Sequence, residues 1–369
     1  MNIILAGGGT AGHVSPALAI AEKIEADDKN SRILFIGRDG GKENEAVSKA
    51  GIELKTLKIE GIQRKITLDN ARRVYRALRS VHDAKSIIKD FQPDVILGTG
   101  GYVCWPVIRA GISLGIPTAI HESNISPGLA TKLLAPKCNK VFLNHSDTEE
   151  YLSRRASCLT VGNPLRKGFK KIKRADARRA LGIKENEVFI LSFGGSIGAK
   201  MLNDVATELM KTYSVSDPCV RHIHATGVRY FDEVKGDSLS RGKNGCRIMP
   251  YIEDMPTYLS AADIVIARAG AMTISEIAAV GVASILIPSP NVSGNHQFKN
   301  ASKLESVGAV IMIEEKNLTI ETLKNRVNDL KNNKIERKNR AKRISEFSTP
   351  NAANLIVREL EKLVFASKS

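Results

Sequence analysis

Two glycine-rich segments stand between an apolar run and a helical pattern, where a polypeptide backbone can bind phosphate. The first is Gly7–Gly12, with the sequence Gly-Gly-Gly-Thr-Ala-Gly, and the second is Gly194–Gly198, with the sequence Gly-Gly-Ser-Ile-Gly. Glycines at such a turn let an anion approach backbone N–H groups at the positive end of the helix dipole. Both segments therefore predict anion-binding loops, and the loops alone leave the anion unidentified.

Two titratable side chains lie close to such helix starts. His13 follows the first glycine segment directly and is either a capping or packing histidine or a general base. The positive end of a helix disfavours the imidazolium form, so a ring placed there stays neutral and able to accept a proton. Glu276 occupies the second turn of a helix expected after Arg268–Ala271. It either makes a structural pairing or, at the carboxyl end of a strand, holds the two hydroxyls of a ribose.

The glycine segments also match the motifs of two other enzyme classes. The first satisfies Gly-x-Gly-x-x-Gly, and Arg38 at the end of the second expected strand suits the 2′-phosphate of NADPH, so an oxidoreductase is one alternative. The second matches Gly-x-Ser-x-Gly, the nucleophile elbow of α/β-hydrolases, and Asp263 and His296 follow Ser196 in the order of a triad. A hydrolase needs only one sheet, however, and would leave the first glycine segment without a role.

Short β-rich runs alternate with helical patterns along the chain, which is typical of βαβ units and a parallel sheet. Both halves open in the same way, with a strand, a glycine turn and a helix. We therefore predict an α/β fold of two doubly wound parallel sheets that face each other, with ligands at the carboxyl ends of the strands. The expected strands are Asn2–Ala6, Ile33–Ile36, Val95–Leu97, Thr118–Ile120, Val141–Leu143, Leu159–Val161, Val188–Phe193, Arg221–Ala225, Arg247–Pro250, Ile264–Ala267, Ser284–Ile287 and Val310–Ile313.

A chain of 369 residues is about twice the usual domain size, so two domains are expected. The stretch Gly162–Arg166, followed by a run of basic residues, interrupts the alternation and is the best linker. A second break falls at Thr349-Pro350, after which Ala352–Phe365 is typical of an amphipathic helix. These breaks predict an N-terminal domain at 1–163, a C-terminal domain at 164–348, and a terminal helix at 349–369 that returns to the N-terminal domain.

Composition narrows the partners and the compartment. With 55 Lys and Arg against 39 Asp and Glu, the net charge of +16 attracts nucleic acid, anionic lipid or phosphorylated small molecules. Aromatic residues make up only 5% of the chain and are not interleaved with a basic stretch, which disfavours single-stranded nucleic acid. Five scattered cysteines without a Cys-x-x-Cys pair indicate a reducing cytosol. The longest apolar region, 264–287, contains Arg268 and Glu276, so we expect no membrane-spanning helix.

Seven segments along essentially the whole chain resemble the MurG family of bacterial glycosyltransferases, which converts lipid I to lipid II. Any one of them is a weak signal, but seven in family order across two domains are specific. They are Gly7–His13, Gly98–Val103, His121–Asn124, Gly162–Arg166, Gly194–Ala199, Arg268–Glu276, and Gln297 with Asn300.

The resemblance implies the GT-B architecture, in which two Rossmann-like domains face a cleft that holds the active site. It implies an inverting transfer of N-acetylglucosamine (GlcNAc) from UDP-GlcNAc to a lipid-linked sugar. The acceptor would be the 4-hydroxyl of the N-acetylmuramic acid (MurNAc) in undecaprenyl-diphosphate-linked MurNAc-pentapeptide, which is lipid I. Related UDP-sugar transferases that act on diacylglycerol share much of the pattern and stay an alternative. A non-catalytic partner subunit that binds a UDP-sugar is a further alternative.

The resemblance also implies roles for individual residues. Glu276 would hold the ribose, Ile252 would meet uracil through its backbone, and Ser196 with its loop would hold the diphosphate. Arg166 would lie near the nucleotide and help the loop to accept the charge that grows on departing UDP. His13 would deprotonate the incoming hydroxyl. The other implied substrate contacts are Thr10, Ala11, Gly12 and Asn124 from across the cleft, and Ala271, Met272 and Thr273, with Ile274 and Ser275 in the same segment, and Gln297 and Asn300 around the sugar.

We expect no cofactor. The chain contains no Asp-x-Asp pair, so a carboxylate-bound metal ion that clamps the diphosphate is not expected either. The dipole of the helix after Gly194–Gly198, together with the cation of Arg166, would stabilise the leaving group instead.

A lipid-linked acceptor requires attachment to a membrane. The stretch Thr67–Phe91 is typical of a helix with one apolar side and a basic remainder, a pattern suited to anionic headgroups. The plain alternative is a core-facing helix with a solvated basic face. Trp105, the only tryptophan, stands where the family has a small residue and suits the headgroup region. We therefore expect a peripheral protein on the cytoplasmic face of the bacterial plasma membrane. The apolar side would consist of Leu68, Ala71, Tyr75, Leu78, Val81, Ile88 and Phe91.

Overall fold

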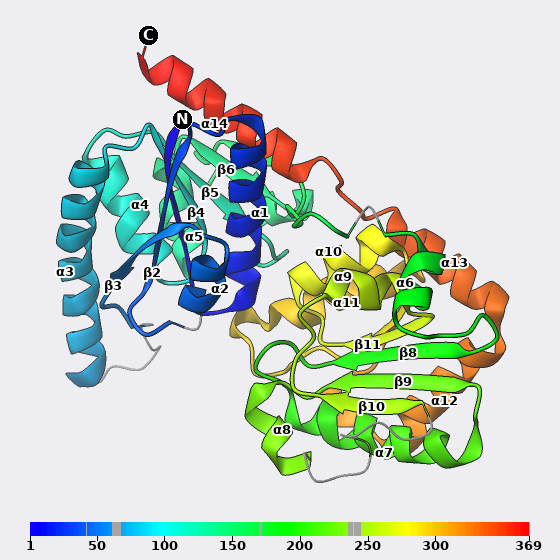
Figure 1. The fold of residues 1–369 in the computed structure, drawn as a ribbon. Coiled ribbons are helices and arrows are strands. Elements are labelled where there is room, and N and C mark those ends of the chain that lie inside the picture. Colours follow the sequence, from blue (N-terminus) through cyan, green and yellow to red (C-terminus); the bar gives the residue numbers. More distant parts are fainter. Residues whose placement is uncertain (42, 61–67, 170–171, 235–238, 240–244, 369) are drawn as a thin grey trace. The chain divides into compact units, whose positions relative to one another are not determined.

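The computed structural model describes the chain except for residues 42, 61–67, 170–171, 235–238, 240–244 and 369. The chain forms two compact units, each with its own parallel sheet and covering helices (Figure 1). The first unit consists of Met1–Arg166 and Thr349–Ser369, and the second of Lys167–Ser348. Arg166 thus belongs to the first unit, together with both ends of the chain.

The first unit contains a seven-stranded sheet in the order β3-β2-β1-β4-β5-β6-β7. All of its neighbouring strands run parallel. Its strands are β1 (Asn2–Gly7), β2 (Arg32–Arg38), β3 (Glu53–Leu57), β4 (Val95–Gly100), β5 (Thr118–Glu122), β6 (Lys140–Leu143) and β7 (Cys158–Thr160). Its α-helices are α1 (Ala11–Asp27), α2 (Glu43–Lys49), α3 (Leu68–Phe91), α4 (Cys104–Ser113), α5 (Leu129–Leu134) and α14 (Ala352–Lys368).

The second unit contains a six-stranded parallel sheet in the order β10-β9-β8-β11-β12-β13. Its strands are β8 (Val188–Phe193), β9 (Val220–Ala225), β10 (Cys246–Met249), β11 (Ile264–Ala267), β12 (Ala283–Leu286) and β13 (Ile311–Met312). Its α-helices are α6 (Arg174–Ala180), α7 (Lys200–Ser216), α8 (Val228–Val234), α9 (Met255–Ala261), α10 (Ala271–Val280), α11 (His296–Ser306), α12 (Ile320–Asn332) and α13 (Lys334–Ser345).

The strand order of each sheet reverses at one point. In the first unit β1 lies between β2 and β4, and in the second β8 lies between β9 and β11. In open α/β sheets the loops at such a switch point diverge and leave a crevice at the carboxyl ends of the strands. The glycine segments follow β1 and β8, so each lies at the switch point of its own sheet. The predicted α/β fold with two doubly wound sheets is therefore confirmed.

Both faces of the first sheet are covered, which is why its central strands are continuous apolar runs. Ile4 and Ile96 face a core shared with α3, α4 and α5, and Ile3 and Leu5 face a core shared with α1. Helix α14 closes this second core together with α1 and buries three apolar side chains there. These are Ile356, Val357 and Leu360.

Each predicted strand is present, with ends shifted by up to three residues, but β3 was missed. This edge strand buries only Leu57 fully, so it lacks an apolar run. Helix α3 is confirmed, and its predicted apolar side is right in part, because Val81, Ile88 and Phe91 pack against the core. Tyr75 and Leu78 are instead 65% and 59% exposed, and the smaller Ala77 and Ala84 are buried. The side chains of the predicted Leu68 and Ala71 lie outside the described residues.

Candidate active site

His13 lies in the first turn of α1, directly after the glycine segment that follows β1. Its Nδ1 lies 3.0 Å from the carbonyl oxygen of Gly8 and 3.2 Å from Oγ1 of Thr10, the residue that precedes the helix. A carbonyl oxygen only accepts hydrogen bonds, so Nδ1 carries the hydrogen and the lone pair of the neutral ring lies on Nε2. The half-buried ring is therefore oriented to accept a proton at Nε2.

Within the first unit, another glycine-rich turn, at the end of β4, packs against His13. Gly100 and Gly101 have φ angles of +118° and +81°. A Cβ on Gly100 would lie 2.4 Å from Cδ2 of His13, and a Cβ on Gly101 would lie 2.1 Å from the carbonyl oxygen of Gly8. The buried Thr99 hydroxyl donates to the backbone carbonyl of His13 at 2.6 Å. Only glycine therefore fits beside the ring at both positions.

These neighbours of His13 were not predicted as functional residues. The segment Gly98–Val103 served only as a mark of resemblance. A signal was nevertheless present, because a Gly-Thr-Gly-Gly run directly after a strand indicates positive φ angles and a close backbone approach. Its target could not be inferred, because Thr99 and His13 are 86 residues apart in the chain.

Asn124, a predicted substrate contact, is held by the carboxylate of Glu122 at the end of β5. One oxygen of Glu122 accepts from the backbone N–H and the side-chain amide of Asn124, at 3.1 and 3.2 Å. The other accepts from the backbone of Gly128 at 3.0 Å and from the hydroxyl of Thr131 at 2.7 Å. Four hydrogen bonds to one buried carboxylate fix the loop and leave Asn124 partly exposed.

In the second unit the glycine segment after β8 leads into the 17-residue helix α7. Gly195 and Gly198 both have a φ of +87°. A Cβ on Gly198 would lie 1.9 Å from the carbonyl oxygen of Thr226, so the loop packs directly on the backbone that follows β9. Ser196 is exposed at the top of the loop, where the unpaired N–H groups of a helix start attract an anion.

The loop after β11 leads into α10, which carries the largest group of predicted donor contacts. Glu276 lies in the second turn of this helix, as predicted. The side chain is half-buried, and desolvation raises the pKa of its carboxyl to about 8. Among the described residues, this carboxylate has no hydrogen-bonding or ionic partner. A desolvated acid without a partner is suited to accept hydrogen bonds from a ligand.

Two of the remaining residues predicted to contact the donor, Asn300 and Gln297, hydrogen-bond to neighbouring loops. The buried Asn300 of α11 donates from Nδ2 to the carbonyl of Ala269 at 3.4 Å. Gln297 accepts from the backbone N–H of Ser289 at 2.9 Å. Ile252 is buried in the loop after β10. The other predicted residues of α10 are buried except Thr273, which is half-buried; they are Ala271, Met272, Ile274 and Ser275.

Every predicted site residue thus follows the carboxyl end of a strand, but Arg166 takes an unexpected partner. Its Nε donates to Glu22 of α1 at 2.7 Å, and its side chain is 52% exposed. A surface ion pair of this kind contributes about 1 kcal/mol or less, so a phosphate can compete for the guanidinium. The resting partner of Arg166 is therefore a carboxylate of the first unit.

The structure rules out the serine hydrolase triad. Asp263 precedes β11, whereas Ser196 follows β8, and these neighbouring strands run parallel. The two residues therefore lie at opposite ends of strands, and the six residues of β8 alone span roughly 20 Å. The carboxylate of Asp263 is instead occupied by Arg178 at 2.9 Å and by the backbone N–H of Phe189 at 3.0 Å. The hydrolase alternative is therefore not favoured.

Comparison with known proteins decides between the two remaining enzyme classes, a glycosyltransferase and an NADPH-binding oxidoreductase. Residues 3–143 match the glycosyltransferase family 28 N-terminal domain, and residues 189–356 match the glycosyltransferase family 28 C-terminal domain. The chain belongs to glycosyltransferase family 28. Family 28 membership explains both glycine loops without a dinucleotide, so the oxidoreductase alternative is no longer favoured.

Within family 28, the likeness to curated transferases covers the full chain. A UDP-N-acetylglucosamine–N-acetylmuramyl-(pentapeptide) pyrophosphoryl-undecaprenol N-acetylglucosamine transferase of Acetivibrio thermocellus is 38% identical over 369 residues, which is 100% of both chains. The transferase of the same name from Thermoanaerobacter sp. is 40% identical over 337 residues, and the match covers 90% of this chain and 92% of the Thermoanaerobacter chain. The crystal structure of Acinetobacter baumannii MurG superposes with a TM-score of 0.75 at 26% identity, and the match covers 98% and 99% of the two chains. The family 28 chain thus has the predicted GT-B architecture.

Proposed function

We propose that this family 28 glycosyltransferase transfers GlcNAc from UDP-GlcNAc to the 4-hydroxyl of MurNAc in undecaprenyl-diphosphate-linked MurNAc-pentapeptide, and so converts lipid I to lipid II. The observation that carries the proposal is the 38% identity, over the whole length of both chains, to a transferase named for that reaction. The site residues add chemistry that such a transfer requires. These are the oriented histidine His13, a glycine loop at the start of a long helix that is suited to bind an anion, and the carboxylate of Glu276, which has no partner among the described residues.

In this proposal the second unit binds the donor. Glu276 accepts hydrogen bonds from the two ribose hydroxyls, and the backbone of Ile252 meets the uracil. The exposed loop around Ser196 holds the diphosphate with N–H groups at the start of α7. As the bond to the sugar breaks, the negative charge on the β-phosphate grows, and the helix dipole stabilises it. Arg166 adds a cation once the phosphate replaces Glu22 as its partner.

The first unit supplies the base. Nε2 of His13 removes the proton from the 4-hydroxyl as this oxygen attacks C1 of GlcNAc, and the bond from C1 to the phosphate oxygen breaks. Attack from the side opposite the departing UDP inverts the configuration at C1. The Gly8 carbonyl keeps Nδ1 protonated and so maintains the tautomer in which Nε2 accepts. Asn124, fixed by Glu122, is a further substrate contact.

The decisive test of the proposed reaction is the release of UDP with a lipid I analogue as acceptor. We expect release with UDP-GlcNAc and the analogue together, and only background hydrolysis when either is omitted. UDP-glucose as donor and diacylglycerol as acceptor serve as comparisons. Release with diacylglycerol but not with the lipid I analogue would assign the chain to the related lipid transferases. An absence of release with every pair would refute the proposal.

The raised pKa of Glu276 predicts opposite effects of pH on stability and on donor binding. A carboxyl with a folded-state pKa of about 8 prefers to be protonated in the folded protein, so its ionisation destabilises the fold increasingly between pH 4.5 and 8. Glu276→Gln should therefore raise the free energy of unfolding at pH 8.5 by on the order of 2 kcal/mol, after allowance for partial exposure of the carboxyl, and have little effect near pH 4.5.

The same substitution should weaken donor binding. Ribose hydroxyls favour the ionised carboxylate, so wild-type affinity for UDP should rise between pH 6.5 and 8.5, and Glu276→Gln should remove this dependence and weaken binding at pH 8.5 about tenfold. Thermal melts with and without UDP over this pH range measure both effects. Equal pH dependence in the two proteins would contradict the role of Glu276.

We further propose that the protein attaches peripherally to the cytoplasmic face of the membrane through the side of the first unit covered by α3, α4 and α5. No helix among the described residues is long and apolar enough to cross a membrane. Tyr75 and Leu78 of α3, and Leu129 and Leu133 of α5, are all more than half exposed. Large apolar side chains exposed beside lysine and arginine are suited to an anionic interface.

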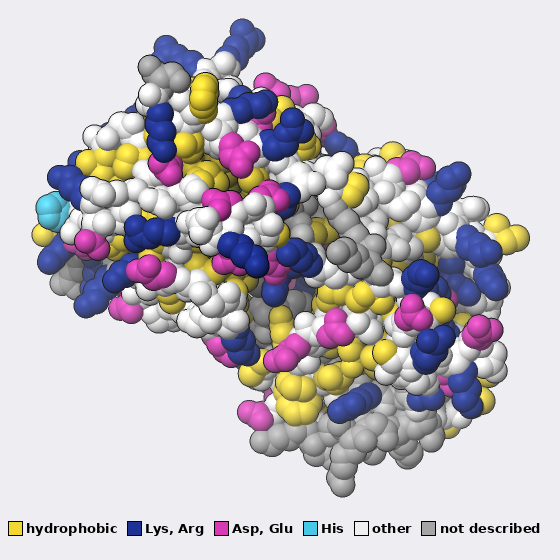
Figure 2. Space-filling model, turned by 45° about the horizontal axis from the view of Figure 1, so that its top comes forward, with side chains coloured by type: hydrophobic (Ala, Val, Ile, Leu, Met, Phe, Trp, Pro, Cys, Tyr) yellow, Lys and Arg dark blue, Asp and Glu magenta, His cyan; other side chains and the backbone are white. Residues whose placement is uncertain are grey.

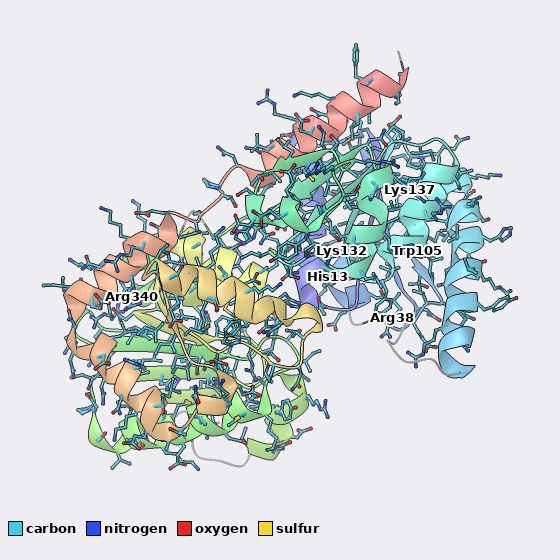
Figure 3. All side chains as sticks on the ribbon, turned by 180° about the vertical axis from the view of Figure 1, so that it is seen from behind. His13, Arg38, Trp105, Lys132, Lys137 and Arg340 are labelled. Atoms are coloured by element: carbon cyan, nitrogen blue, oxygen red, sulfur yellow. The ribbon has the colours of Figure 1, made fainter. Side chains whose placement is uncertain are left out.

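Basic residues surround these apolar side chains. Lys and Arg side chains gather along α3 at the left edge of Figure 2. Figure 3 places Lys132 and Lys137 on the same side of the unit as Trp105, whose half-buried ring packs against the core beneath α4. Trp105 therefore contributes mainly to packing in the free protein and only partly to the surface.

Replacing Leu78 and Arg79 tests this attachment. The double variant Leu78→Ser, Arg79→Glu should bind vesicles of anionic phospholipid about tenfold more weakly, because each basic residue near such a surface contributes about 1 kcal/mol. The control Lys338→Glu changes the net charge equally at an exposed position of α13 in the second unit. Co-sedimentation with the vesicles measures the binding of the double variant and of the control. If the control lost as much binding as the double variant, net charge rather than this surface would explain the attraction.

A further inference from the structure

Beneath the diphosphate loop of the second unit lies a chain of buried polar side chains that the proposed reaction does not use. Ser192 of β8 and His222 and His224 of β9 are fully buried, and Asn203 of α7 is 6% exposed. Oγ of Ser192 lies 2.7 Å from Nε2 of His222 and 2.8 Å from Nδ1 of His224. Nε2 of His224 lies 3.1 Å from Oδ1 of Asn203.

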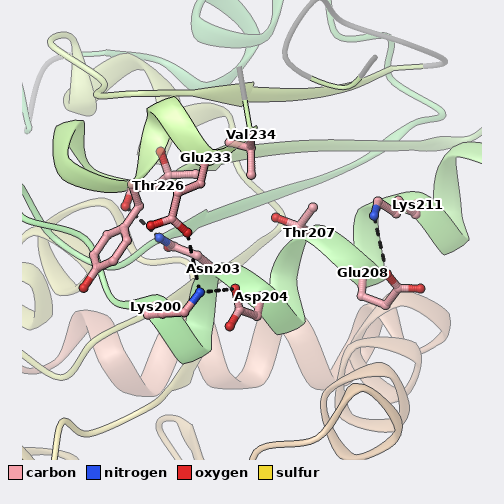
Figure 4. Close-up of a pocket in the computed structure, with 10 residues that line it drawn as sticks. Lys200, Asn203, Asp204, Thr207, Glu208, Lys211, Thr226, Glu233 and Val234 are labelled. Carbon is pink, nitrogen blue, oxygen red and sulfur yellow. Dashed lines mark hydrogen bonds and ion pairs between the residues drawn. The ribbon is translucent and has the colours of Figure 1, made fainter. Parts of the chain in front are cut away.

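The chain ends on the backbone that supports the glycine loop. Nδ2 of Asn203 donates to the carbonyl oxygen of Thr226 at 2.9 Å, and Figure 4 shows Asn203 reaching from the first turn of α7 to Thr226. That carbonyl is the atom that a Cβ on Gly198 would meet at 1.9 Å. Gly227 packs equally closely, since a Cβ there would lie 2.4 Å from the backbone nitrogen of Gly198. The position of Thr226 therefore sets the position of Gly198.

The direction of each hydrogen bond follows from this last carbonyl. Because the Thr226 carbonyl can only accept, Asn203 must present its amide nitrogen to it and its oxygen to His224. Nε2 of His224 must then carry a hydrogen, so Nδ1 of the neutral ring accepts from the Ser192 hydroxyl at 2.8 Å, and its 3.2 Å approach to the Ser192 carbonyl oxygen is not a hydrogen bond. Burial lowers the pKa of His224 to about 4 and keeps the ring neutral. His222 completes the chain by donating from Nε2 to Ser192.

We propose that Asn203 and His224 are positioning residues that hold the Thr226 carbonyl, and through it Gly198, in the arrangement that lets the glycine loop bind the donor's diphosphate. The inference rests on the proposed function, because it takes the loop after β8 to be the diphosphate site. Neither side chain touches the substrate. Their effect is confined to the loop, so the uridine part of the donor, bound by other loops, does not depend on them.

The experiment compares the affinities for UDP and for uridine, which lacks the diphosphate, by titration calorimetry. Asn203→Leu and His224→Leu each remove one hydrogen-bonding side chain of the buried chain and replace it with an apolar side chain of similar volume. Each should weaken UDP binding about tenfold while uridine binding stays unchanged. His224→Gln retains an amide donor near the position of Nε2 and should restore UDP affinity to within about threefold of wild type. The double variant should lose no more than either single variant, because the two residues act in series.

Asn328→Leu is the matched control. Asn328 of α12 lies in the same unit and accepts a hydrogen bond from the Tyr213 hydroxyl at 2.9 Å, so the same substitution removes a hydrogen bond far along the chain from the loop. It should lower the melting temperature without changing UDP affinity. Equal losses for UDP and uridine in Asn203→Leu, or no loss for either ligand, would overturn the inference. Wild-type protein that binds neither ligand would instead refute the proposed function itself.

Discussion

Replacing His13 with alanine is expected to reduce turnover by about 10²- to 10⁴-fold, the usual contribution of a general base, with UDP affinity unchanged. The expectation follows from the orientation of the ring. Nδ1 is committed to the Gly8 carbonyl, which leaves Nε2 as the atom that accepts the proton of the acceptor hydroxyl. Single-turnover rates with the lipid I analogue, measured beside UDP titrations, separate the loss of chemistry from any loss of binding.

A second substitution tests the same base without removing it. In Gly100→Ala the new Cβ would lie 2.4 Å from Cδ2 of His13, so the ring must move. We expect this variant to share much of the rate loss of His13→Ala. Rates that stay near wild type in His13→Ala, or UDP affinity that falls in proportion to the rate, would show His13 to be structural.

The substitution Gly198→Ala is expected to weaken UDP binding by about 30-fold or more, with little change for uridine. A Cβ at this position would lie 1.9 Å from the Thr226 carbonyl, so the loop must shift and its N–H groups lose their alignment with the diphosphate. The loss of one hydrogen bond to a charged group is roughly 2 kcal/mol, which corresponds to this factor. Titration calorimetry with both ligands measures the difference.

Gly182→Ala controls for backbone strain. Gly182 has a φ of +64° and open space where a Cβ would lie, so alanine there adds the strain of a left-handed conformation without a collision. Both variants should melt at lower temperature than wild type, but only Gly198→Ala should lose UDP affinity. A loss of UDP affinity in both would mean that general destabilisation, and not the position of the loop, explains the result.

Local sequence patterns predicted most of the fold and the glycine loops that follow β1 and β8. The strands of the sheet centres are continuous apolar runs, and the glycine segments stand next to them, so β1, β8 and their loops follow from short stretches of sequence. Strand β3 was not predicted, because an edge strand that buries only Leu57 has no apolar run. The buried side of α3 was predicted only in part, because it includes the small Ala77 and Ala84, whereas the larger Tyr75 and Leu78 are exposed.

What could not be predicted are contacts between loops that are distant in the chain. His13 was identified from its place after a glycine segment, but its support by Thr99, Gly100 and Gly101 depends on β1 and β4 being neighbours. Glu276 was likewise placed on its helix, but only the structure shows that its carboxyl has no partner among the described side chains. The ion pair between Arg166 and Glu22 joins residues 144 positions apart and has no local signal.

The position of α14 bears on how the chain matures during synthesis. Because Ile356, Val357 and Leu360 fill the core on the α1 side, the first unit is completed by residues that are synthesised after the whole of the second unit. The second unit is continuous in sequence and is complete before α14 has been translated. The core of the first unit can therefore be completed only after the second unit has been synthesised, and an apolar stripe of α1 stays uncovered until α14 has been translated.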